Sequence, residues 1–267
     1  MTERPIGIFD SGVGGLTVLA KVKETLPNES IIYVGDTANA PYGGKSREAL
    51  LSHARDIIRF LKNHDAKAVV LACGTTSSTV FQQLSDENPD IPLVDVIRPG
   101  VKACIGLTSQ NPGLKLGLIA TAATIKSGLF AKMLQEQGIP ILAQACPLFA
   151  PMVEAGVNSG PIAEWAAEAY IGEWRSRINA LVLGCTHYPL LADALTKTLG
   201  SDIKLINLAS HAAEALKIKL AEADCLNVGS APPTYRYYVS GEPDTFNKTA
   251  RFLLGKSPGA TKITTKP

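Results

Sequence analysis

Two cysteines in this chain stand where a thiol could do chemistry. Cys73 ends the apolar run AVVLAC and precedes the small polar tract GTTSS, and Cys185 ends ALVLGC and precedes Thr186 and His187. In each case a buried strand would stop at the sulfur and a helix would begin beyond it, where free N–H groups favour a thiolate. One such cysteine is usually a small core residue. Two in matching positions indicate a pair of reactive thiols.

A pair of opposed thiols suits stereoinversion at a carbon atom. One thiolate removes a proton from the carbon, the thiol on the opposite face delivers another, and the reverse reaction exchanges the roles. This chemistry needs both groups near the reacting atom with suitable pKa values, and their titrations are coupled. A single cysteine with His187 would instead indicate nucleophilic catalysis, as in a cysteine hydrolase, which leaves the other thiol without a role.

Three ionisable residues are candidates for assisting the thiols. Asp10, in FDSGVGG, would lie at the carboxyl end of its strand, at the same sheet edge as Cys73. His187 could tune Cys185 or protonate a substrate carboxylate, and Glu154 follows an apolar run near the expected cleft. The simpler alternatives are a capped turn at Asp10 and a solvated carboxylate at Glu154.

The segment GDTANAPYGGKS, residues 35–46, is typical of a structured loop. Its backbone N–H groups and the Tyr42 hydroxyl could bind a small anion. The alternative is a turn-rich connection without a ligand.

The segments that would position these residues alternate between short β-branched runs and amphipathic helices. The predicted strands are 6–9, 31–35, 68–73, 93–97, 116–121, 141–146, 180–185, 204–208 and 235–241. Continuous apolar strands that alternate with helices predict an α/β fold with doubly wound parallel sheets. Such folds bind ligands at the carboxyl ends of their strands.

The shared pattern of AVVLACGT and ALVLGCTH predicts two similar α/β domains with the active site in the cleft between them. RPG at 98–100 and NLAS at 207–210 interrupt the strand–helix rhythm. We therefore expect a discontinuous N-terminal domain, residues 1–97 plus 208–267, and an inserted domain, residues 98–207. The lysine-bearing tail from 255 onward is expected to be a frayed terminus.

Composition excludes several classes of function. The 267 residues carry a net charge of only +2 without a basic run, so neither a nucleic-acid partner nor a membrane surface is expected. No apolar stretch reaches the length of a membrane helix, and the first residues do not resemble a signal peptide, which together predict a cytoplasmic protein. Five cysteines without a CxxC pair indicate neither a disulfide framework nor a zinc site.

The ordered motifs resemble those of the cofactor-independent aspartate/glutamate racemase superfamily, and within it the glutamate racemases. They are GIFDSGVGGLTV, GDTANAPYG, LACGTTSS, LIATAATIKSG, CPLFAPMVEAG, GCTHYPLL and YYVSGEPDTF, which span nearly the whole chain. The resemblance implies interconversion of L- and D-glutamate for peptidoglycan synthesis, with no cofactor or metal. It also implies that the protein forms a homodimer. The only other partner that it implies is a small-molecule amino-acid substrate.

The resemblance also implies roles for individual residues. Cys73 and Cys185 match the two acid/base residues, and Asp10, Glu154 and His187 match their assisting groups. The substrate-contacting positions match Asp10, Ser11, Pro41, Tyr42, Gly43, Gly74, Thr75, Thr76, Thr121, Thr186 and His187.

Three positions depart from the pattern of that family. Gly74 stands where the family has Asn within CNTA, Asn39 where it has Arg, and Arg98 where it has Glu. Loss of an amide at the reacting centre would remove a hydrogen bond of about 0.5–1.5 kcal/mol. Two alternatives therefore stay open: a racemase or isomerase of the superfamily for a different amino acid or small acid, and a non-catalytic binding or regulatory protein.

Overall fold

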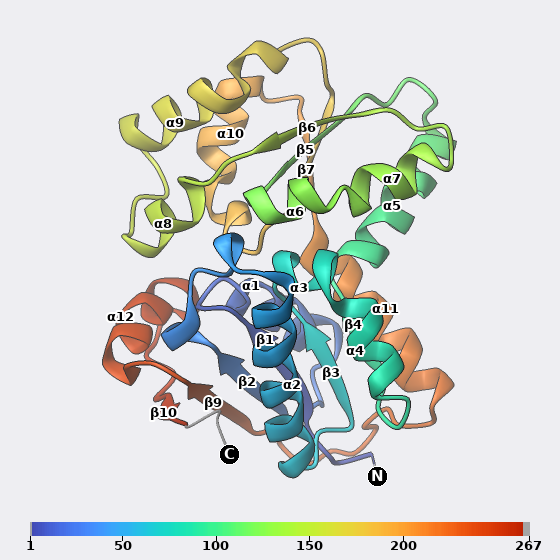
Figure 1. The fold of residues 1–267 in the computed structure, drawn as a ribbon, viewed down its shortest axis with the longest axis vertical. Helices are drawn as coiled ribbons and strands as arrows, with labels where there is room; N and C mark the ends of the chain where they lie inside the picture. Colours follow the sequence, from blue (N-terminus) through green and yellow to red (C-terminus); the bar gives the residue numbers. More distant parts are fainter. Residues whose placement is uncertain (1, 264–267) are drawn as a thin grey trace.

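The computed structural model describes residues 2–263, which form two parallel β-sheets with helices on both faces (Figure 1). The six-stranded sheet has the order β10-β9-β2-β1-β3-β4, and the four-stranded sheet has the order β6-β5-β7-β8. Every paired strand is parallel to its neighbour. This confirms the predicted class, two doubly wound α/β units. None of the helices within residues 2–263 is long and apolar enough to cross a membrane.

Every strand predicted from the sequence is present. The strands are β1 (Ile6–Asp10), β2 (Ile31–Gly35), β3 (Ala68–Leu71), β4 (Leu93–Asp95), β5 (Leu116–Ala120), β6 (Ile141–Ala145), β7 (Ala180–Leu183), β8 (Lys204–Asn207), β9 (Tyr235–Val239) and β10 (Thr261–Lys262). The expectation of a frayed tail was wrong for β10, which pairs with β9. The tail residues 264–267 lie outside the described residues.

The helices alternate with the strands. The α-helices are α1 (Leu16–Thr25), α2 (Arg47–Asn63), α3 (Gly74–Thr79), α4 (Phe81–Glu87), α5 (Ile97–Gln110), α6 (Ala122–Ser127), α7 (Leu129–Gln135), α8 (Phe149–Glu154), α9 (Pro161–Ile171), α10 (Ala192–Leu199), α11 (Leu208–Glu222) and α12 (Pro243–Leu254). Short 3-10 turns are η1 (Thr37–Asn39), η2 (Tyr42–Gly44), η3 (Gly172–Trp174) and η4 (Tyr188–Leu191).

Helix α2 illustrates how the sequence builds one layer. The Ser46 side chain caps its start by accepting a hydrogen bond from the Ala49 N–H group. Its apolar side chains recur at helical spacing and are buried against the six-stranded sheet. A side chain at Gly7 in β1 would approach Leu61 to within 2.8 Å. The glycine therefore allows α2 to pack directly on the strand that ends at Asp10.

Helices α5 and α11 pack on one another at the point where the chain crosses between the sheets (Figure 1). Their buried side chains join one apolar cluster that contains residues of both sheets, such as Ile8 and Leu118. The domain division at 97/98 and 207/208 stays a prediction. The separation of β5–β8 from the other strands supports it.

The expectation that RPG at 98–100 interrupts the pattern was wrong, because these residues form the first turn of α5. A proline is tolerated there, since the first turn has no partner for its N–H groups. The buried Asp95 carboxylate accepts hydrogen bonds from the N–H groups of Ile97 and Arg98. The Arg98 guanidinium lies 3.2 Å from Asp95 and 4.5 Å from the Phe81 ring centroid. The charge reversal at position 98 therefore has a local partner.

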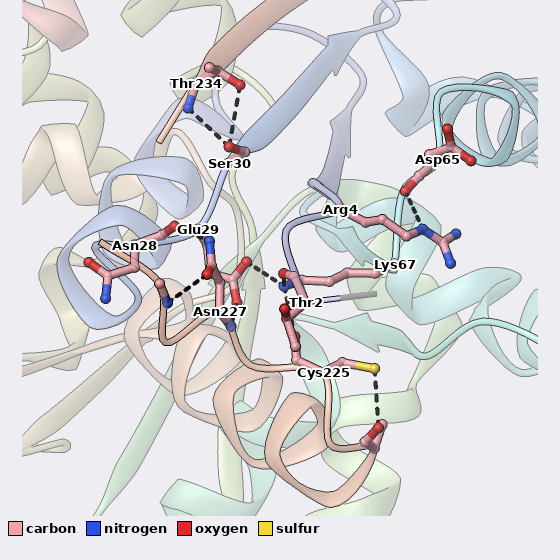
Figure 2. A network of polar contacts seen from close by, with 12 residues as sticks. Thr2, Arg4, Asn28, Glu29, Ser30, Asp65, Lys67, Cys225, Asn227 and Thr234 are labelled. Carbon is pink, nitrogen blue, oxygen red and sulfur yellow. Dashed lines mark hydrogen bonds and ion pairs between the residues drawn. The ribbon is translucent and has the colours of Figure 1, made fainter. Parts of the chain in front are cut away.

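A buried ion pair fastens the amino ends of β2 and β3 (Figure 2). The Lys67 ammonium lies 2.6 Å from the Glu29 carboxylate, and both side chains are almost fully buried. The ammonium also donates to the Cys225 carbonyl at 2.8 Å, while Glu29 accepts from the Asn227 N–H group at 2.9 Å. These bonds hold the loop after α11 against the sheet, at the end opposite to Asp10 and Cys73.

Candidate active site

The carboxyl ends of strands from both sheets meet at one cleft of about 500 Å³. Asp10 and Cys73 reach it from β1 and β3 of the larger sheet, and Thr121 and Cys185 reach it from β5 and β7 of the smaller sheet. This is the position at which doubly wound α/β folds bind ligands. Both sulfur-bearing residues lie in the wall of this one cavity, as the opposed-thiol interpretation requires.

Thirteen of the predicted site residues line this cleft. They are Asp10, Ser11, Pro41, Tyr42, Gly43, Cys73, Gly74, Thr75, Thr121, Glu154, Cys185, Thr186 and His187. Thr76 is the exception: its side chain is fully buried and does not line the cleft. The expected contact between Thr76 and a substrate is therefore wrong in this geometry. Within residues 2–263, no group of three or more His, Cys, Asp or Glu side chains is placed to hold a metal ion.

Cys73 lies among neutral hydroxyl groups and an acid. It is the residue that precedes α3, and its Sγ atom lies 3.8 Å from the Ser11 Oγ atom. Burial and, to a smaller extent, the nearby Asp10 raise the pKa of the Cys73 thiol to about 12, although the N–H group and hydroxyl of Thr76 act to lower it. At neutral pH these surroundings keep the proton on Cys73.

Asp10 is buried, and its carboxylate is hydrogen-bonded to groups from both sides of the cleft. Its Oδ2 atom accepts a hydrogen bond from the Gly15 N–H group at 2.6 Å and one from the Thr186 hydroxyl at 3.5 Å. Burial raises the pKa of the Asp10 carboxyl, although His187 and the bond from Gly15 oppose that shift. The strand end thus holds a carboxylate that links the β1 loop to the β7 loop.

Cys185 has a basic neighbour instead. The His187 Nδ1 atom lies 3.6 Å from the Cys185 Sγ atom, and His187 Nε2 lies 2.9 Å from the Glu154 carboxylate. Burial lowers the pKa of His187, but the hydrogen bonds to Cys185 and Glu154 outweigh burial and raise it to about 10. His187 is therefore an imidazolium at neutral pH, and an adjacent cation favours the thiolate form of a cysteine. This arrangement gives the predicted assisting roles of His187 and Glu154 a physical basis.

The glycines after β1 make room for this second thiol. A side chain at Gly14 would come within 2.4 Å of the Thr186 hydroxyl and 2.5 Å of the His187 ring. The Thr17 hydroxyl donates a bond of 3.0 Å to the Thr186 carbonyl from the same region. A capped turn was only the simpler alternative for FDSGVGG, and neither interpretation predicted this contact, for which the only signal is a glycine that precedes a helix.

The loop at 35–46 is organised by a residue that the sequence analysis did not single out. The buried Asp36 carboxylate accepts hydrogen bonds from Asn39 at 3.0 Å, from the Tyr42 hydroxyl at 2.5 Å and from Ser240 at 2.6 Å. The expected grip of the Tyr42 hydroxyl on an anion is wrong here, because that hydroxyl is bound to Asp36. Asn39, which replaces the family's arginine, has the same partner. Hydrogen bonds between residues of the loop itself stabilise its conformation, and Tyr42 in this loop lines the cleft.

Gly74 lies directly against the opposite side of the cleft. A Cβ atom added at Gly74 would lie 2.6 Å from the Gly184 carbonyl oxygen, which is closer than real Cβ contacts allow. The added atom would point at the opposite backbone and would not fill the cleft. The glycine therefore serves the approach of the two cysteine-bearing loops, and its presence does not enlarge the space for a substrate.

Two parallel-sheet units that each contribute one thiol to a shared cleft define a class of α/β proteins equipped for proton transfer on two faces of one carbon. A family model described as Asp/Glu/Hydantoin racemase matches residues 6–216. The chain belongs to this family, which confirms the resemblance seen in the motifs.

Full-length relatives are similar throughout. The glutamate racemase of Thermoanaerobacter pseudethanolicus is 39% identical over 263 residues, which cover 96% of this chain and 95% of that protein. The glutamate racemase of Geobacter metallireducens is 38% identical over 260 residues, with coverage of 96% and 95%. A crystal structure of glutamate racemase from Francisella tularensis in complex with D-glutamate is 36% identical, with a TM-score of 0.90 and coverage of 100% of this chain and 99% of that chain.

Proposed function

We propose that this protein interconverts L- and D-glutamate by a two-base mechanism in which Cys73 and Cys185 are the acid/base residues. The observation that carries the proposal is one cleft with a thiol from each sheet and opposite protonation environments on its two sides. The full-length similarity to proteins described as glutamate racemases, including one bound to D-glutamate, supports glutamate as the substrate.

The geometry suggests an order of events. The Cys185 thiolate, paired with the His187 imidazolium, removes the α-proton of the enantiomer whose C–H bond faces it. The Cys73 thiol then donates its proton to the opposite face of the carbon. The protein is left with a Cys185 thiol and a Cys73 thiolate, which is the form that acts on the other enantiomer. The two sulfurs thus carry one proton between them in either form.

Hydroxyl groups around the thiols are suited to hold the substrate's carboxylates. Ser11 and Thr186 lie at the strand ends beside Cys73 and Cys185, and Thr75 and Thr121 are linked by a hydrogen bond of 3.0 Å between their hydroxyls across the cleft. Such neutral donors bind an anionic substrate without a fixed positive charge. Pro41, Gly43 and the Tyr42 ring would complete the enclosure.

The same proposal includes the finer expectations from the family resemblance. The protein would act in the cytoplasm as a homodimer and supply D-glutamate for peptidoglycan synthesis. Sedimentation of the purified protein at several concentrations measures its oligomeric state, and a monomer at all of them would remove the dimer from the proposal.

The decisive experiment supplies each glutamate enantiomer to the purified protein without added cofactor in deuterated buffer. Chiral chromatography should show approach to an equal mixture from both sides, and NMR should show loss of the α-proton signal. Aspartate, glutamine and small diacids form the comparison panel. Turnover restricted to one of those compounds would contradict glutamate as substrate, and binding without α-proton exchange would contradict catalysis.

A further inference from the structure

Thr76 carries a polar group without a function in the site described so far. Its side chain is fully buried, and its Oγ1 atom has no hydrogen-bond partner among the described residues. A buried hydroxyl without a partner is destabilising, and valine would fill the same volume without that penalty. A hydroxyl in such a position is expected to have a partner in some other state of the protein.

Cys73 is the group that changes state within reach of Thr76. Cys73 precedes α3 as its N-cap residue, and Thr76 is the third residue of that helix. The N-cap residue and the third residue belong to the same first turn, and the Cys73 side chain makes no capping hydrogen bond while the thiol is neutral. The hydroxyl and N–H group of Thr76 both lower the pKa of Cys73, in opposition to the effects of burial and Asp10.

The interaction depends on the charge of the sulfur. A neutral thiol is a weak acceptor, so the Thr76 hydroxyl gains little while Cys73 holds its proton. A thiolate is a strong acceptor, and hydrogen bonds to ionised groups are about twice as strong as neutral ones. Cys185 has the His187 imidazolium to stabilise its charged form, whereas the groups in contact with Cys73 are neutral hydroxyls or the acidic Asp10.

We propose that Thr76 is a positioning residue for the reaction: its hydroxyl donates a hydrogen bond to the Cys73 thiolate each time that sulfur has given its proton to the substrate. The proposal rests on the two-thiol function proposed above. The hydroxyl acts on one side of the cleft only, and it does for Cys73 what His187 does for Cys185.

The test reads the Cys73 thiolate directly and needs no substrate. Iodoacetamide alkylates the thiolate, so at a fixed pH below the thiol's pKa the rate measures the thiolate fraction. The rate at Cys73 and at Cys185 would be followed by mass spectrometry of the peptides that contain them. Thr76→Val should slow alkylation of Cys73 about tenfold, which corresponds to about one pKa unit, and should leave Cys185 unchanged. Thr76→Ser should restore the rate at Cys73 to within about twofold.

Two further variants keep the test decisive. Thr76→Ala removes the hydroxyl without adding bulk, so the pair Thr76→Ala and Thr76→Ser decides the question if Thr76→Val does not fold. Thr198→Val is the matched control, because Thr198 is also buried but lies in α10, away from the cleft. Wild-type alkylation of Cys73 in Thr76→Ala would overturn the proposal, and so would an equal loss at Cys185. Alkylation does not require glutamate turnover, so a failure of the racemase proposal would be visible separately.

Discussion

The two sides of the cleft place the same thiol at the same structural position and surround it with different chemistry. Cys73 follows the end of β3 by two residues, and Cys185 follows the end of β7 by two residues. Cys73 then meets hydroxyl groups and Asp10, whereas Cys185 meets His187, which is itself held by Glu154. The first environment keeps the proton on its thiol, and the second places an imidazolium beside its sulfur.

In the proposed mechanism, the difference explains how two similar units would perform a reaction that neither performs alone. Two identical environments would favour either two thiols or two thiolates, and neither state can remove a proton on one face while delivering one on the other. Unequal environments assign one proton to the pair. The similarity of the units positions the sulfurs, and the dissimilar neighbours make them complementary. The predictions below test that comparison, beginning with the largest expected effect.

Removal of either thiol should abolish racemisation while leaving opposite halves of the reaction. Cys73→Ala and Cys185→Ala should each lower the racemisation rate by about 10²–10⁴-fold, because each removes a positioned acid/base group. Cys73→Ala keeps Cys185 beside the His187 imidazolium and should retain solvent exchange of the α-proton for one glutamate enantiomer only. Cys185→Ala leaves Cys73, which holds its proton at neutral pH, and should exchange the opposite enantiomer much more slowly. NMR in deuterated buffer measures both properties.

The control for this pair is Cys225→Ala, since Cys225 lies outside the cleft in the loop after α11. It should racemise glutamate at the wild-type rate. Exchange of both enantiomers by a protein with only one of the two thiols would contradict the assignment of one face to each sulfur.

Gly74→Ala should disturb the distance between the two sides without removing any functional group. The added methyl group would meet the Gly184 carbonyl at 2.6 Å, so the loops that carry Cys73 and Cys185 must separate. A misplacement of about 1 Å can lower a rate about 10²-fold. We expect a loss of that order in the racemisation rate, with a smaller loss in α-proton exchange, because exchange needs only one thiol.

The matched control is Gly106→Ala in α5, where an added methyl group would meet nothing within 4 Å. It should have unchanged kinetics. An active Gly74→Ala protein with wild-type rates would show that the close approach of the two loops does not set the spacing of the sulfurs.

The sequence was sufficient to predict the elements and the thiol pair, since both depend on local pattern. AVVLAC and ALVLGC reveal the buried strands by continuous apolar residues and place each cysteine at a strand end. The short strand β10 could not be predicted, because only pairing with β9 makes it a strand. RPG lies within α5 because a proline is compatible with the first helical turn, where the sequence pattern gave no sign of a continuing helix.

Side-chain contacts within loops and between distant segments could not be predicted from the sequence. The Tyr42 hydroxyl is bound to Asp36, Gly14 accommodates His187, and Gly74 approaches Gly184. Each contact depends on the path of a loop or on the rotamer of a side chain. The spacing of residues in the sequence determines neither the path nor the rotamer. The resemblance to a known family placed Thr76 among the substrate contacts, whereas its burial behind the cleft wall emerged only from the structure.

The smallest expected effect is a change in the free energy of unfolding. It should have opposite signs for substitutions of Asp10, beside Cys73, and of His187, beside Cys185. Burial raises the pKa of Asp10 above its ordinary value of 3.8, so the charged form costs stability once the pH exceeds the raised value. Asp10→Asn should therefore increase the free energy of unfolding at pH 7 by about 1 kcal/mol. His187→Gln should decrease it by about 1 kcal/mol, because Cys185 and Glu154 lose the imidazolium that both of them contact. Urea unfolding measures both values.

The pH dependence separates the His187 effect from general damage. The pKa of His187 rises from 6.5 to about 10 on folding, so its contribution to stability is complete below pH 6.5 and is lost as the pH rises through 10. The deficit of His187→Gln should therefore shrink between pH 6.5 and 10. Solvent screens the half-exposed Glu154, which keeps the His187 effect small. A deficit that does not change with pH would mean that His187 stabilises the fold by packing alone. That result would contradict the proposed contrast between the two thiols, which requires a charged His187 beside Cys185.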